Sequence, residues 1–130
     1  MPDGYLVTRE IKGHLPSMKN GRLRTRLGTF IKSKECQEYE KIFAYQIRPQ
    51  DRIKYAGPVS LKCRVWYRSA RSDLDIEYLK DLLQRNEILV NDRQVQHQES
   101  WKGVDRENPR LIFSIYPYKE SVPKKVQSKI

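Results

Sequence analysis

Between Val59 and Tyr67, apolar residues at every second position alternate without interruption with serine, lysine, arginine and tryptophan. Successive side chains of a strand point to opposite faces, so this pattern predicts a strand with one buried face. Such a face must be covered by another layer of secondary structure. We therefore expect a fold in which a sheet packs against a second layer.

Two segments that flank this strand are predicted to supply the second layer. Each has apolar residues at the three- and four-residue spacing of an amphipathic helix, and Ser33 is placed to cap the first. The apolar stripes are Cys36, Tyr39, Ile42, Phe43 and Ile47 in the first helix, and Leu74, Tyr78, Leu79, Leu82 and Leu83 in the second.

Residues 5–12, 95–102 and 111–116 are predicted to be further strands, the last because it is rich in β-branched and aromatic residues. Residues 14–29 and 48–58 contain the glycines and prolines typical of loops. The resulting order is β-α-β-α-β-β. It predicts an α+β protein, a two-layer α/β sandwich with a small mixed sheet and two main helices.

The chain of 130 residues has the length of one ordinary domain. We expect residues 1–118 to form that domain and residues 119–130 to be a flexible basic tail. Cys36 and Cys63 lie far apart, without a Cys-x-x-Cys pair or a cluster with histidines. They are therefore expected to be reduced and buried in the core rather than to bind zinc.

The formal charge of +10 and the isoelectric point near 9.7 indicate an anionic partner, and nucleic acid is the commonest one. No stretch approaches the roughly 20 apolar residues of a membrane-spanning helix. The segment from Met1 to Glu10 lacks the apolar core of a signal peptide. We expect a cytoplasmic protein without a membrane partner.

A basic run at the start of the chain is the first candidate for contact with nucleic acid. It contains six basic residues and no acidic one. Such a run is often only a solvated surface, but on so basic a chain we favour contact with phosphates. The six residues are Lys19, Arg22, Arg24, Arg26, Lys32 and Lys34.

Asp73 and Asp75 stand two residues apart, just after the predicted central strand. On extended backbone their carboxylates point to one side, and two like charges held close favour a cation between them. A helix and a return would bring Asp92 back beside this pair. Because Mg²⁺ prefers carboxylate oxygens, the three could hold a metal that activates water for attack on a phosphodiester. Lys80 would add positive charge against the developing negative one.

A plain structural interpretation fits the same residues. Asp73 and Asp75 stand at the start of a helix, where the dipole favours carboxylates whatever the function. By helix propensity alone, Lys80 suits an exposed position. The flanking Arg68 and Arg71, on a chain with the composition of a nucleic-acid binder, favour the metal site.

The stretch from Arg71 to Val95 resembles the RusA family of Holliday-junction resolvases. It contains an Asp-Leu-Asp pair, a helical segment and then Asn-Asp-Arg-Gln-Val from Asn91 onward. Nearer the start of the chain, residues 15–20 are similar to the family's Pro-Ser-x-x-Asn loop, and residues 32–39 to the start of its first helix. The resemblance covers approximately residues 5–118.

The resemblance implies a homodimeric, Mg²⁺-dependent endonuclease that resolves four-way DNA junctions, with Mn²⁺ able to substitute. Asp73, Asp75 and Asp92 match the family's essential acidic residues. A two-fold dimer suits two equivalent cuts in a junction of near two-fold symmetry. A bacterial or phage origin is consistent with the family. The residues expected to contact DNA are Lys19, Asn20, Arg22, Arg24, Arg26, Lys32, Lys34, Arg68 and Arg71.

Two positions depart from the family pattern. The family usually has Asn directly after the second Asp and Lys four residues after it, whereas this chain has Ile76 and Leu79 there, with Lys80 one position later. These changes favour a first alternative, a catalytically silent protein that binds branched DNA. A second alternative is a basic RNA-binding protein in which the aspartates cap helices.

Overall fold

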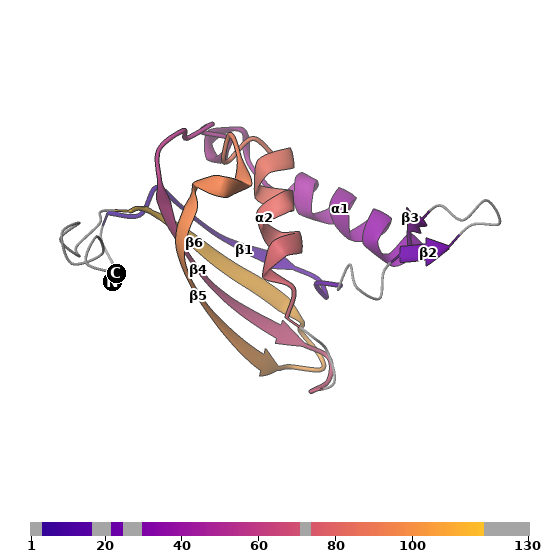
Figure 1. Ribbon diagram of the computed structural model, residues 1–130. Helices are drawn as coiled ribbons and strands as arrows, with labels where there is room; N and C mark the ends of the chain where they lie inside the picture. The colour runs from indigo at the N-terminus through magenta and orange to yellow at the C-terminus, as the bar shows by residue number, and fades with distance from the viewer. Residues whose placement is uncertain (1–3, 17–21, 25–29, 71–73, 119–130) are drawn as a thin grey trace, which may run out of the picture.

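The structure is a computed structural model that describes residues 4–16, 22–24, 30–70 and 74–118. Its elements, labelled in Figure 1, follow a β-α-β-α-β-β order to which a small hairpin is added. They are β1 (Val7–Lys12), β2 (Arg22–Arg24), β3 (Phe30–Lys32), α1 (Lys34–Gln46), the short 3-10 helix η1 (Pro49–Asp51), β4 (Val59–Tyr67), α2 (Ile76–Arg85), the 3-10 helix η2 (Asp92–Gln94), β5 (Val95–Val104) and β6 (Arg110–Pro117).

The sheet has four strands in the order β1-β6-β4-β5. Strand β4 pairs antiparallel with β6 and parallel with β5, and β1 closes the other edge antiparallel to β6. Helices α1 and α2 lie on the same side of this sheet (Figure 1). The predicted α+β fold, with a small mixed sheet and two helices, is confirmed.

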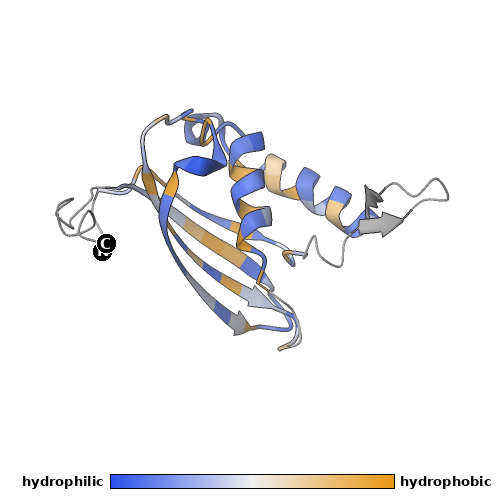
Figure 2. Ribbon diagram, viewed as in Figure 1, coloured by the Kyte–Doolittle hydropathy of each residue, from blue (hydrophilic) through white to orange (hydrophobic). Residues whose placement is uncertain are grey.

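The alternation of apolar and polar residues that predicted β4 reflects burial of one face of the strand. Every second residue from Val59 to Tyr67 is buried beneath the helices, while the residues between them face the other side of the sheet. Figure 2 shows hydrophobic and hydrophilic positions alternating in this way along the strands. Cys36 and Cys63 are both free and buried, as predicted, and burial raises the pKa of the Cys63 thiol to about 11.

Helix α1 begins where the sequence predicts, because the Ser33 hydroxyl accepts a hydrogen bond of 3.2 Å from the amide of Cys36. Its apolar stripe is narrower than predicted. Tyr39, Phe43 and Ile47 are buried, but 44% of Ile42 is exposed. Ile42 lies one residue before Phe43, about 100° round the helix, and so stands at the margin of the buried face.

An ion pair ties β1 to η1 on the helix side of the sheet. The Arg9 guanidinium donates to both carboxylate oxygens of Asp51, at 3.0 and 2.8 Å, and the Arg48 amide donates to one of them at 2.9 Å. Only 8% of the Asp51 side chain is exposed. Burial alone would raise the pKa of Asp51, but these hydrogen bonds and the arginine charges outweigh burial and leave the pKa below its usual value.

One segment differs from the sequence prediction. The region predicted as a loop over residues 14–29 contains β2, which pairs with β3 in a hairpin beside the amino end of α1 (Figure 1). Leu89, after α2, forms a single bridge with Tyr55. The predicted tail, residues 119–130, lies outside the described residues. None of the described helices has the length and apolar character needed to cross a membrane.

Candidate functional site

Asp75, the second residue of the Asp-Leu-Asp pair, is the cap of α2. Its carboxylate accepts a hydrogen bond of 3.0 Å from the amide of Tyr78, and only 7% of the residue is exposed. The helix-cap interpretation of Asp75 is therefore confirmed. Asp73 and Arg71 lie outside the described residues, so the predicted alignment of the two carboxylates is not tested.

Asp92 belongs to a turn whose other polar groups serve the fold. The Asn91 side chain accepts from the amide of Arg93 at 2.8 Å, and the Gln94 side chain accepts from the amide of Asn91 at 2.7 Å. The Gln94 amide also donates to the carbonyls of Tyr55 and Gly57, both at 2.7 Å. By contrast, the Asp92 carboxylate makes no hydrogen bond or ion pair with any other described residue.

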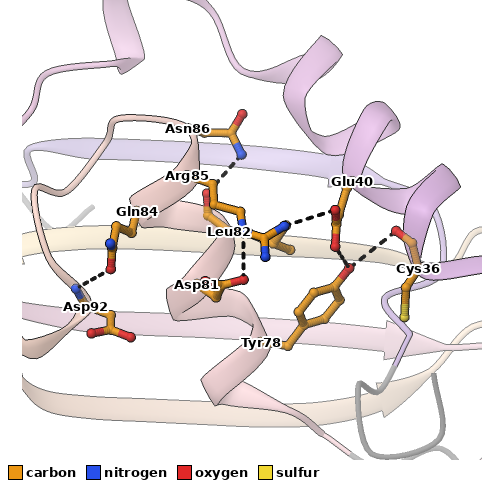
Figure 3. Close-up of polar contacts among 9 residues, drawn as sticks. All are labelled: Cys36, Glu40, Tyr78, Asp81, Leu82, Gln84, Arg85, Asn86 and Asp92. Carbon is orange, nitrogen blue, oxygen red and sulfur yellow. Dashed lines mark hydrogen bonds and ion pairs between the residues drawn. The ribbon is translucent and has the colours of Figure 1, made fainter. Parts of the chain in front are cut away.

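The turn that carries Asp92 is attached to α2. The Asp92 amide donates to the side chain of Gln84 at 3.0 Å (Figure 3). Gln84 itself is nine residues beyond Asp75, which corresponds to about 13 Å along a helix axis. The return of Asp92 to the acidic pair stays a prediction, because Asp73 lies outside the described residues.

Lys80 lies between these two aspartates along α2. Its ammonium group forms an ion pair of 2.7 Å with Glu77, and only 14% of its side chain is exposed. Lys80 and Gln84 are one turn apart and therefore lie on the same side of the helix. Lys80 is thus more buried than an ordinary exposed helix lysine, and it lies on the side of α2 that carries the Asp92 contact.

The other flank of α2 is fixed to α1 by a polar network (Figure 3). The Tyr78 hydroxyl donates to Glu40 at 3.0 Å and to the carbonyl of Cys36 at 3.4 Å, and Arg85 forms an ion pair of 3.1 Å with Glu40. Burial and the Glu40 charge raise the pKa of Tyr78 far above its usual value, so the hydroxyl stays a donor. Through Tyr78 near its start and Arg85 at its end, α2 is therefore held along its length against the first half of α1.

His14, which was not predicted from the sequence to belong to the site, lies near the carboxyl end of β4. The His14 ring contacts the ring of Tyr67 edge-on at 5.3 Å and lies 3.9 Å from the carboxylate of Glu35. Burial and the positive charge of Arg68 lower the His14 pKa, although Glu35 opposes them. A single histidine in a sequence gives no sign of such neighbours. Its place just before the Pro-Ser loop is the one available signal.

The basic residues predicted to contact DNA are only partly described. Arg68 and Lys34 are both exposed, and Lys34 is the first residue of α1. The amino end of a helix attracts anions and disfavours a positive side chain. A bound phosphate would be attracted both by this helix end and by Lys34. Of the others, the backbones of Arg22, Arg24 and Lys32 lie in the hairpin. Lys19, Asn20 and Arg26 lie outside the described residues.

The predicted Mg²⁺ ligands differ in whether the fold already uses their carboxylates. The Asp92 carboxylate is an oxygen donor that the fold does not use, whereas Asp75 already caps a helix. In the described ranges no three His, Cys, Asp or Glu side chains are grouped closely enough to hold a metal ion. The magnesium site stays a prediction, because Asp73 is not among those residues.

No family model matches the chain, and no curated protein matches its sequence. The resemblance to RusA resolvases therefore rests on the motifs themselves.

The turn that carries Asp92 depends on Gln94, and replacing Gln94 with alanine is expected to lower the free energy of unfolding by about 1–3 kcal/mol. The change removes three hydrogen bonds of 2.7 Å each. Chemical denaturation would measure the loss. Gln96→Ala removes a single exposed bond of 3.2 Å and is the control. An equal effect of both variants would show that Gln94 does not hold the turn.

Proposed function

We propose that this protein is a Mg²⁺-dependent endonuclease that cuts branched DNA, with four-way junctions as the substrate implied by its RusA-like motifs. The observation that carries the proposal is the unused carboxylate of Asp92 in a turn where the neighbouring Asn91 and Gln94 are both hydrogen-bonded. Among the described residues, the fold uses the side chains of Asn91 and Gln94 but not that of Asp92. We therefore infer that the Asp92 carboxylate has a role other than stabilising the fold.

The arrangement around α2 supports the same proposal. Both motif elements lie next to one helix, Asp75 as its cap and Asp92 beside its last turns, with Lys80 between them. Arg68 and Lys34 add exposed positive charge at the end of the molecule where β4 finishes and α1 begins. Charge of this kind attracts the phosphate backbone without regard to base sequence.

In this proposal Asp73, Asp75 and Asp92 hold the Mg²⁺. When bound, the ion supplies Lewis-acid stabilisation of the phosphodiester and lowers the pKa of a water molecule. Lys80 places positive charge near the oxygen that becomes negative in the transition state. Arg68 and Lys34 bind flanking phosphates and orient the strand to be cut.

The test is cleavage of a mobile four-way DNA junction, with duplex and fork controls, in Mg²⁺ and in EDTA. We expect paired symmetric nicks that require metal and fall at least about 100-fold in Asp75→Asn. Asparagine caps helices as well as aspartate does, so this change removes the charge and keeps the cap. Glu38→Gln, which removes an exposed carboxylate of α1, is expected to cut normally.

A second candidate function is binding of branched DNA without cleavage. It is favoured by the burial of Asp75, whose carboxylate is already committed to the cap, and by the hydrophobic residues Ile76 and Leu79. The same assay separates the two functions. Tight junction binding with no nicks in Mg²⁺ or Mn²⁺ would contradict the endonuclease proposal and support the silent binder.

A further inference from the structure

The face of the sheet opposite the helices carries a mixture of aromatic and basic side chains. Both tryptophans of the chain, Trp66 and Trp101, belong to it. No described helix covers this side (Figure 1), and 45% of Trp101 is exposed. We call it the open sheet face and define it by Lys62, Arg64, Trp66, Trp101, Arg110 and Tyr116.

Cations and aromatic rings alternate across the open sheet face. The strand register places Arg64 beside Trp101 and Trp66 beside Arg110. The guanidinium of Arg64 lies 5.2 Å from the Trp101 ring centroid, and that of Arg110 lies 4.0 Å from the Trp66 centroid. Lys62 lies 5.2 Å from the ring of Tyr116. Each aromatic ring therefore has a positive group within reach.

Gly103 keeps room on this face for the Trp66 ring. A Cβ atom at position 103 would lie 3.0 Å from a ring carbon of Trp66 and 3.2 Å from its nitrogen. Without that atom the indole lies over β5, beside a depression of about 190 Å³ that is also lined by Arg64 and Trp101. The two indole rings thus border one recess on an otherwise open surface.

The charges around the two indole rings are mainly positive. Arg110 forms an ion pair of 2.9 Å with Asp105, but Lys62 and Arg64 have no carboxylate partner among the described residues. The register also places two carboxylates on this side of the sheet: Glu99 lies beside Lys62 and 3.4 Å from His97, and Glu10 lies on the outer strand β1 opposite Ile112. A partner that offers flat rings and negative charge would match the region around the indoles, where Lys62 and Arg64 lie.

We propose that the open sheet face binds unpaired DNA strands, with bases stacked on Trp66 and Trp101 and phosphates held by Lys62 and Arg64. Stacking of a base on an aromatic side chain contributes about 1–3 kcal/mol and tolerates any base. An unpaired strand offers base faces that a duplex hides. The inference goes beyond the proposed cleavage and does not require it, since a protein that never cuts DNA could use this surface.

A second copy of the chain fits the open sheet face less well. A two-fold contact through this region would place Lys62 and Arg64 against the same region of the other copy, where most of the charges are positive as well. Removing like charges from water without opposite partners is costly. DNA phosphates supply the missing opposite charge.

The test is binding of a fluorescently labelled oligothymidine of about 15 nucleotides, measured by anisotropy in EDTA so that cleavage plays no part. We expect binding to quench tryptophan fluorescence, and Trp101→Ala to weaken the affinity roughly 5- to 150-fold. Trp101→Phe should recover part of the loss because a ring remains. Lys62→Ala should instead reduce the dependence of affinity on salt concentration.

Tyr45→Ala is the matched control, because Tyr45 is an aromatic residue of α1 that is 91% exposed on the helix side. It should bind the oligonucleotide normally, and Trp101→Ala should bind duplex DNA as the unaltered protein does. Wild-type affinity of Trp101→Ala for oligothymidine would overturn the proposal. So would sedimentation data in which Trp101→Ala converts a dimer into monomers while oligonucleotide binding is unchanged.

Discussion

Replacing Asp92 with asparagine is expected to reduce metal-dependent junction cleavage at least about 100-fold while changing the free energy of unfolding by no more than about 0.5 kcal/mol. The large functional effect follows from loss of an anionic metal ligand. The small structural effect follows because the Asp92 backbone amide keeps its bond to Gln84, while the carboxylate has no partner among the described residues. Single-turnover cleavage and chemical denaturation would measure the two quantities.

Arg93→Gln is the control for Asp92→Asn, because it changes the charge of the next residue, which is exposed in the same turn. We expect it to alter the affinity for DNA only slightly and to leave the cleavage step intact. Normal cleavage by Asp92→Asn would exclude Asp92 as a metal ligand. A loss of stability above about 1 kcal/mol would mean instead that its carboxylate serves the fold.

The second large effect is expected for Asp51→Ala, which should lower the free energy of unfolding by about 3 kcal/mol. The change leaves the Arg9 guanidinium without its carboxylate partner. Because 21% of the Arg9 side chain is exposed to water, we expect the loss of stability to be at the low end of the range for a broken buried ion pair. Asp81→Ala is the control, since it breaks the exposed pair with Arg85 and should cost no more than about 0.5 kcal/mol.

The same ion pair predicts how stability depends on pH. The pKa of Asp51 is lower in the folded state than its usual value. The ionised Asp51 carboxylate therefore contributes fully to the free energy of unfolding above about pH 4, which is the pKa of aspartate in an unfolded chain. The contribution is lost as pH falls further, through the folded pKa. Stability measured from pH 6 down to about pH 2 should fall less steeply for Asp51→Asn than for the unaltered protein, and equal slopes would contradict this account.

The layers of the fold were predictable because periodicity reports burial directly. Alternation from Val59 to Tyr67 identified β4, and the spacing of Tyr78, Leu79, Leu82 and Leu83 identified α2. The same reasoning was wrong for Ile42, because spacing gives the side of a helix and not the width of the surface that covers it. The hairpin of β2 and β3 was missed because strands of three residues are too short to show a period.

The candidate site was less predictable, because its residues come from turns. The sequence identified Asp75 and Asp92 as functional candidates, but it could not show that the Asp92 amide is bound by the side chain of Gln84. It also gave Asn91 and Gln94 no separate role, whereas the structure shows that their side chains hold the turn. The alternation in β4 contained Trp66, but only the pairing of β4 with β5 places Trp101 on the same face, opposite Arg64.

The position of β6 has a consequence for how this chain folds as it is synthesised. β6 lies between β1 and β4, yet every other element of the sheet precedes it in the sequence. Until β6 has left the ribosome, β1 and β4 lack the strand that joins them. Their unpaired strand edges stay exposed during that time, and contacts between such distant segments form slowly. We expect the complete sheet to form only after β6 has emerged from the ribosome.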